Sequence, residues 1–153
     1  MQSKGFTFLE VMIAISVITI GIIGIYTLIP RVISITSANI DKFIASRLGE
    51  EGIEVVRNIR DSNWLKEGTA WDNGLTDGDW RVQYDKDFLL TFSDEPLKID
   101  GNGFYNYDVG SLTKFKRKVT VSHLENYLNV KVQITWPNKT SPFEAEENLY
   151  DWR

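Results

Sequence analysis

The feature that most constrains this chain is a run of twenty uncharged residues, 11–30, close to the start of a 153-residue sequence. As an α-helix rising about 1.5 Å per residue, the run spans ~30 Å, the thickness of the hydrocarbon layer of a bilayer. It therefore predicts a membrane-crossing helix. Lys4 precedes the run and favours a cytoplasmic N-terminus with the remainder translocated, whereas Arg31, just beyond the run, weakens that preference.

Beyond this run the sequence has the length and composition of one folded domain. A net charge of −4 and a pI near 5.0 argue against broad, non-specific nucleic-acid binding, which requires a surface that neutralises phosphates. The chain has no cysteine. Disulfides, thiolate catalysis and cysteine-ligated metals are therefore excluded.

Two general interpretations of the apolar segment leave something unexplained. A secretory signal peptide has an apolar core of roughly 7–15 residues with its cleavage site directly after it, whereas the acceptable small-residue site here, 36–38, lies well past the end of the run. A plain signal anchor fits the length but gives no role to Glu10, a carboxylate at the margin of the run. At the centre of a membrane helix an acidic residue costs ~2.5–3.5 kcal/mol on insertion scales, and less at an end.

Residues 4–10 read Lys-Gly-Phe-Thr-Phe-Leu-Glu, which resembles the prepilin peptidase site of type IV pilins and type II secretion pseudopilins. The resemblance implies cleavage between Gly5 and Phe6 on the cytoplasmic face, methylation of the new Phe6 amine, and retention of the apolar helix. It also implies that Glu10, with Thr7 in the same contact, meets the Phe6 ammonium of a neighbouring subunit. In a dry filament core these two charges have to neutralise each other. The alternative, that Glu10 merely sits at the level of the lipid headgroups, stays open.

The helical pattern continues past Pro30. Apolar residues recur mostly four and seven positions apart and charged residues occupy other faces, which predicts an amphipathic helix as far as about Arg60 and a rod of ~80 Å in all. The apolar set is Ile33, Ile40, Ile44, Leu48, Val55 and Ile59. In the pilin family a stretch of this helix can unwind within the filament. The equivalent stretch here is expected between Gly21 and Pro30, where glycine and proline lower helix propensity.

A loop is predicted at residues 61–79, which are rich in turn-forming residues. Its acidic cluster suggests calcium, since some major pseudopilins bind this ion. The spacing matches no EF-hand loop, however, and turn chemistry explains the same residues. The cluster comprises Asp72, Asn73, Asp77 and Asp79. No metal site and no cofactor are assigned.

From Trp80 onward the apolar residues alternate with a period of two, which predicts an antiparallel sheet. Short strands are expected at 80–84 and 88–92, and a hairpin at 97–100 with 104–107. A longer hairpin pairs 115–121 with 128–136 across a loop at 123–126, and Phe143–Trp152 adds a last strand. One buried face of this sheet is expected to pack on the amphipathic helix, giving an α+β fold of the pilin type.

The predicted organisation is a leader at 1–5, a transmembrane and filament-core helix at 6–30, its amphipathic continuation at 31–60, a loop at 61–79 and a sheet region at 80–153. Segments 49–64, 115–121, 128–137 and 151–153 look like PilV-type minor pilins and the related minor pseudopilins. Many pilins close the C-terminal loop with a disulfide, which this chain lacks. A family role for that loop is therefore not carried over.

The resemblance implies a non-catalytic structural subunit of a type IV pilus or a type II secretion-like filament. The implied partners are a prepilin peptidase and methyltransferase, other pilin subunits and the pilus assembly machinery. The implied location is the inner membrane, crossed once with the N-terminus in the cytoplasm and the C-terminal domain outside it, and then the filament.

A binding role on the same scaffold, in DNA uptake or adhesion, is the main rival. Lys114, Lys116 and Lys118 share one outward strand face, and a simple hairpin register places Lys118 opposite Lys131. The alternative is an ordinary solvated face. Residues Trp64, Trp71 and Trp80 are interpreted either as exposed aromatics that dock a neighbouring subunit or as cover for a small core.

An enzymatic role finds little support in the sequence. The single histidine, His123, falls in the predicted hairpin loop, where a solvated or turn-bonded imidazole is the common case. No serine lies in a nucleophile-elbow context and no glycine-rich phosphate loop follows a strand. The prediction is therefore a protein without catalytic activity.

Overall fold

The computed structural model describes residues 5–137 and 141–151 and consists of a long helix followed by β-strands. Lys4, Trp152 and Arg153, named above, lie outside the described residues. The elements are α1 (Phe8–Leu65), β1 (Gly78–Arg81), β2 (Leu90–Thr91), β3 (Pro96–Ile99), β4 (Tyr105–Asn106), β5 (Ser111–Leu124), β6 (Tyr127–Thr135) and β7 (Phe143–Tyr150). The chain divides into two compact units, residues 1–41 and 42–153, each described here by itself.

The helix α1 continues past Pro30, where the sequence predicted a weakened helix, and past Arg60, where it predicted the end of the helix. Pro30 lies inside it without ending it, and the helix runs on to Leu65 rather than ending near Arg60. Its last turn is held by the loop that follows, because the Asn63 amide donates hydrogen bonds to the carbonyls of Trp71 and Asn73, at 3.1 and 2.8 Å. Residue Asn63 is buried although it is polar. The predicted unwinding between Gly21 and Pro30 concerns the filament and stays a prediction.

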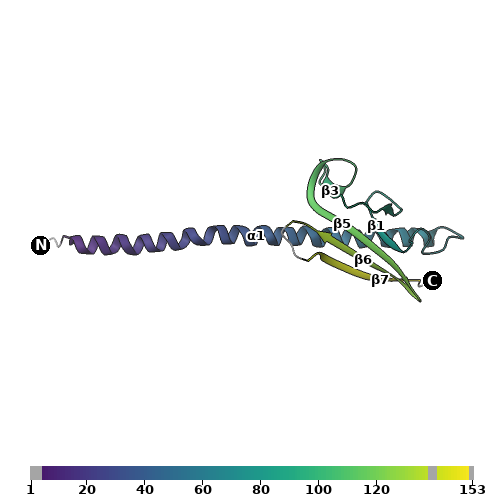
Figure 1. Ribbon diagram of the computed structural model, residues 1–153, viewed down its shortest axis with the longest axis horizontal. Helices are drawn as coiled ribbons and strands as arrows, with labels where there is room; N and C mark the ends of the chain where they lie inside the picture. Colours follow the sequence, from purple (N-terminus) through teal and green to yellow (C-terminus); the bar gives the residue numbers. More distant parts are fainter. Residues whose placement is uncertain (1–4, 138–140, 152–153) are drawn as a thin grey trace. The chain divides into compact units, whose positions relative to one another are not determined.

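The sheet is antiparallel throughout and is organised around β5 (Figure 1). Strand β3 pairs with the first half of β5 and β1 with its second half, while β6 pairs along the opposite edge and is followed by β7. The hairpin of β3 and β4 was predicted and is confirmed. The strands predicted at 80–84 and 88–92 are shorter, because Val82 and Gln83 leave the ladder as buried side chains.

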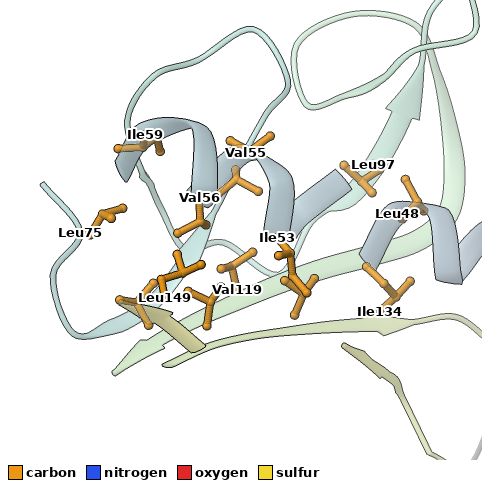
Figure 2. Close-up of a cluster of buried hydrophobic side chains, with 14 of the residues drawn as sticks. Leu48, Ile53, Val55, Val56, Ile59, Leu75, Leu97, Val119, Ile134 and Leu149 are labelled. Atoms are coloured by element: carbon orange, nitrogen blue, oxygen red, sulfur yellow. The ribbon is translucent and has the colours of Figure 1, made fainter. Parts of the chain in front are cut away.

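The helix residues that follow Lys42 pack on one face of this sheet, which confirms the predicted α+β fold. Figure 2 shows Leu48 and Val56 of α1 directed toward Ile134 and Val119 of the sheet, and these four residues are almost completely buried. The inward alternation predicted for the long hairpin is confirmed at each of its apolar positions from Phe115 to Ile134. Burial of apolar area on this scale is the main favourable contribution to folding.

The helix approaches the sheet closely at two glycines. A Cβ atom built on Gly49 would lie 2.9 Å from a ring carbon of Phe143, and one on Gly52 would lie 2.9 Å from a methyl carbon of Val132. Cβ atoms essentially never lie this close to another atom, so a larger residue at either position requires the side chain of Phe143 or Val132, or the helix, to shift. Together with Ala45, which is fully buried, they form a row of small residues facing the sheet.

Candidate functional site

The first candidate site is the start of α1. Thr7 caps the helix: its hydroxyl accepts a hydrogen bond from the Glu10 amide at 3.3 Å, and its carbonyl accepts from the amides of Glu10 and Val11. Thr7 and Glu10 are thus spaced as in a capping box, with the acidic residue in the first turn, where the helix dipole favours negative charge. The Glu10 side chain is exposed.

Gly5 has no structural reason to be glycine. It precedes the helix, is exposed, and a Cβ atom built on it would meet nothing within 4 Å. Its φ is not among the positive values, which are found at five other glycines, Gly68, Gly74, Gly78, Gly103 and Gly110. Phe6 beside it is 82% exposed. Among the described residues, therefore, no close contact accounts for glycine at this position.

The apolar residues that follow are not buried within the structure. Among the described residues, α1 is a helix long and apolar enough to span a membrane, and none of its apolar window is buried. A core helix of a soluble domain would be largely buried. Three hydroxyl side chains in this stretch, those of Ser16, Thr19 and Thr27, donate to helix carbonyls three or four residues earlier, so their polar groups are satisfied without water.

The second candidate site is the outward face of the long hairpin. The predicted register is wrong: Lys118 lies opposite Gln133, and Lys131 lies opposite Thr120. The turn between β5 and β6 is shorter than predicted, since His123 and Leu124 belong to β5, and this moves the pairing by two positions. A shift of two leaves the buried face unchanged, which is why the core was predicted correctly.

Each of three lysines on this face is paired with a carboxylate. Lys116 contacts Asp94 at 2.6 Å, Lys118 contacts Asp79 at 3.3 Å, and Lys131 contacts Glu144 at 2.9 Å. The fourth, Lys114, lies over the ring of Phe115 at 5.7 Å. Because acidic residues accompany the lysines, the face is close to neutral rather than a basic stripe.

These contacts also shift the ionisation of the acidic partners. The hydroxyl of Thr120, which donates to Asp79 at 2.6 Å, and the Lys118 ammonium lower the pKa of the Asp79 carboxyl. Hydrogen bonds from Lys131 and Gln133 lower the pKa of Glu144. The same ion pair raises the pKa of Lys131. Both carboxylates are therefore held in their charged form by the fold.

The acidic loop suggested for calcium is used in other ways. The side chains of Asp72 and Asp77 contact the His123 ring, and the Asp79 carboxylate accepts hydrogen bonds from Thr120 and Lys118. Within residues 5–137 and 141–151 no group of three His, Cys, Asp or Glu side chains is arranged to hold a metal ion. His123 is on strand β5, not in the predicted loop.

The tryptophans suggested as exposed docking residues are half-buried, and that interpretation is wrong in this respect. Trp71 and Trp80 pack against the core, and the Trp80 indole N–H donates to the Thr76 carbonyl at 2.8 Å. The guanidinium of Arg60 lies over the ring of Trp64. The indole rings therefore cover the end of the core, which is the other interpretation considered above.

Sequence reasoning missed Arg117, the more deeply buried of two buried arginines, Arg60 and Arg117, in the described part of the chain. Arg117 occupies an inward position of β5 between Phe115 and Val119 and is 1% exposed. Its guanidinium donates to the carbonyls of Leu48 (3.2 Å) and Val82 (2.7 Å) and forms an ion pair with Glu51 at 2.9 Å. The signal was present in the sequence, since a charged residue at an inward position of an alternating strand has to find a buried partner.

Comparison with known proteins adds one match. A family model described as the prokaryotic N-terminal methylation motif matches residues 1–26. The match covers Gly5, Phe6, Thr7, Glu10 and most of the apolar run. No curated protein and no solved structure matches the chain.

Proposed function

We propose that this chain, whose residues 1–26 carry a type IV pilin-like prepilin signal, is a non-catalytic structural subunit of a type IV pilus or a type II secretion-like filament. One observation carries the proposal. A glycine in open surroundings and a capped acidic helix start stand directly before the apolar first part of α1, where none of the apolar window is buried among the described residues. A surface of this kind needs lipid, and then other subunits, to cover it.

The proposed processing uses the first residues of the motif. A prepilin peptidase cuts between Gly5 and Phe6 and methylates the Phe6 amine, and the chain stays in the inner membrane with its C-terminal unit on the extracytoplasmic side. The exposed, irregular backbone at Gly5 supports this proposal, because a peptidase binds its substrate in an extended form. The resemblance to PilV-type minor pilins and minor pseudopilins supports a minor rather than a principal subunit.

The proposed assembly contact joins Glu10 of one subunit to the Phe6 ammonium of the next. After cleavage Phe6 is the chain terminus and Thr7 begins the capped turn that presents Glu10. In a water-free filament core an unpaired carboxylate is costly, and an ammonium beside it removes that cost. Apolar packing between helices supplies most of the assembly energy, and the charge pair sets the register.

Processing is tested by intact-mass measurement and N-terminal sequencing of the full-length chain expressed with a prepilin peptidase. We expect a product that begins at Phe6 and carries the mass of one added methyl group. A Gly5→Val variant should remain uncut. Gly21→Val is the matched control, since Gly21 has equally open surroundings, and it should be processed normally. A wild-type product that begins at Met1, or near Asn39, contradicts the proposal.

The assembly contact is tested separately with Glu10→Gln. Glutamine keeps the capping-box geometry but carries no charge. If Glu10 acts by pairing with an ammonium, this variant is inserted and cleaved but is not incorporated into filaments recovered from the cell surface. Glu10→Asp, which keeps the charge, should retain part of the incorporation. Normal incorporation of Glu10→Gln would reduce Glu10 to a helix-capping residue.

The alternative function, DNA uptake or adhesion through Lys114, Lys116, Lys118 and Lys131, is less well supported. Asp94, Asp79 and Glu144 each pair with one of these lysines, which leaves little net positive charge for phosphates. A role in DNA uptake or adhesion stays a prediction, which salt-dependent DNA binding tests.

A further inference from the structure

The single histidine joins two parts of the chain far apart in sequence. His123 lies near the end of β5, and its ring is held between two carboxylates of the loop that precedes β1. Its Nδ1 is 2.6 Å from Oδ1 of Asp77, and its Nε2 is 3.4 Å from Oδ2 of Asp72. The backbone N–H of His123 donates to the same Asp77 oxygen at 2.6 Å.

The chemistry of imidazole limits which form of the ring fits this arrangement. A neutral imidazole has one N–H donor and one acceptor nitrogen, whereas an ionised carboxylate is an acceptor only. With a carboxylate oxygen against each ring nitrogen, both contacts are favourable only when both nitrogens carry a proton. The hydrogen bonds with the His123 side chain and backbone also lower the pKa of Asp77, which favours the ionised form of this partner.

Charged residues at neighbouring positions of the chain either have other partners or are exposed to solvent. On the β1 side the nearest carboxylate along the chain, Asp79, is bound to Thr120 and Lys118. On β6 the residue opposite His123 is Leu128, which carries no charge. Glu125, in the turn that follows β5, is exposed.

The loop that His123 holds also covers the end of the core. Leu75 is fully buried, and its amide donates to the Asp72 carbonyl at 2.9 Å. The first half of the same loop, up to Trp71, lines a shallow hollow together with Trp64 and Asp151. Any loosening of the loop therefore changes the surface at this end of the C-terminal unit.

We propose that His123 in its charged form clips loop 66–77 to the end of β5, and that loss of one ring proton loosens the loop. Histidine is the side chain whose charge most readily changes near neutral pH, so the proposed contact can be tested as a dependence on pH. The loop then keeps its other attachments, which do not need a second ring proton: the packing of Leu75 and Trp71, the hydrogen bonds of the Asn63 amide, the Trp80 N–H to Thr76 and the His123 backbone N–H to Asp77. Loosening is therefore local and not a release of the whole loop.

The test is amide hydrogen exchange of the full-length protein in detergent micelles, followed by NMR at about pH 5.5 and about pH 8.0. Protection factors, corrected for the intrinsic pH dependence of exchange, are compared for the amides of Leu75 and Val130. Exposed ion pairs typically change a local equilibrium about two- to fivefold. We expect protection of Leu75 to fall by that factor at the higher pH while Val130, on β6, is unchanged. Equal or greater Leu75 protection at the higher pH overturns the proposal.

Two variants separate the clip from general effects of pH. His123→Gln cannot be charged, and Asp72→Asn removes one carboxylate, so the pH dependence at Leu75 should disappear in the first and shrink in the second. Asp87→Asn, in a different loop, is the matched control and should keep the wild-type pH dependence. A pH dependence of full size in His123→Gln would show that another group is responsible.

Discussion

Replacing the two members of the buried ion pair between β5 and α1 should have unequal effects on stability. The Arg117 side chain is wholly buried, whereas the Glu51 side chain retains 32% of its exposure. Removing Glu51 therefore leaves a buried guanidinium without a counter-ion, while removing Arg117 leaves a carboxylate that water can reach. The smaller and more exposed residue is expected to be the more costly to lose.

The magnitudes follow from the contacts of each side chain. Loss of one partner from a buried pair costs about 3–5 kcal/mol, and for Glu51→Ala we expect about 3 kcal/mol, because carbonyls of Leu48 and Val82 still accept hydrogen bonds from Arg117. For Arg117→Met the lost hydrogen bonds are offset by the desolvation that the guanidinium no longer requires. We expect a change within about 1.5 kcal/mol.

The assay is urea unfolding of the full-length chain in detergent, followed by tryptophan fluorescence. Each of the five tryptophans lies beyond residue 63, so the signal reports the C-terminal unit. Glu50→Ala is the matched control on the same helix. Its ion pair with Arg47 is solvent-exposed and should contribute no more than about 0.5 kcal/mol.

Two results would refute this reasoning. The first is a loss of about 3 kcal/mol or more in Arg117→Met, which would show that the buried cation is strongly stabilising in itself. The second is a Glu51→Ala variant as stable as Glu50→Ala, which would show that the carbonyls alone suffice to hold the guanidinium.

Three further predictions concern packing, pH and the lysine face. Gly52→Ala should cost about 1–3 kcal/mol in urea unfolding, because its Cβ would lie 2.9 Å from a β6 valine methyl, whereas Gly101→Ala, in open space, should be near neutral. Because the folded pKa values of Asp79 and Glu144 are lowered, their contribution to stability is complete above about pH 5, beyond the unfolded values, and is lost as the pH falls through the lowered folded values. Urea midpoints measured between about pH 6 and 2.5 should therefore decline below about pH 5. In a DNA-binding assay at about 50 and 200 mM salt we expect no salt-sensitive binding, and binding that disappears in Lys118→Glu would establish the alternative function.

Much of the fold could be predicted because it rests on periodicity. The apolar run of 11–30, the amphipathic pattern after it and the period-two alternation after Trp80 each depend on neighbours along the chain, so they define the helix, the strands and the buried face of the sheet. The candidate site at the N-terminus is equally local, since residues 4–10 form one uninterrupted motif.

The predicted ends of strand β5 and helix α1 were both wrong because they were placed by the polarity of the side chains. His123 and Leu124 were assigned to a loop because their neighbours are polar, yet their backbones continue the ladder with β6 and their side chains lie at the surface. Asn63 was placed past the end of a helix for the same reason, although its amide is buried and fully used by the loop. Sequence reports the polarity of a side chain and not whether the backbone beneath it is paired.

The sequence by itself predicted an apolar helix long enough to cross a membrane, a prepilin-type signal at its start and an antiparallel sheet packed against the continuation of that helix. The tertiary structure alone decided which charges meet: Arg117 with Glu51, the lysines with Asp94, Asp79 and Glu144, and His123 with two loop aspartates. These pairs join residues that are between 13 and 66 positions apart. Their formation depends on which strands lie side by side and in which register. The length of the β5–β6 turn, for example, places Gln133 opposite Lys118 and Thr120 opposite Lys131.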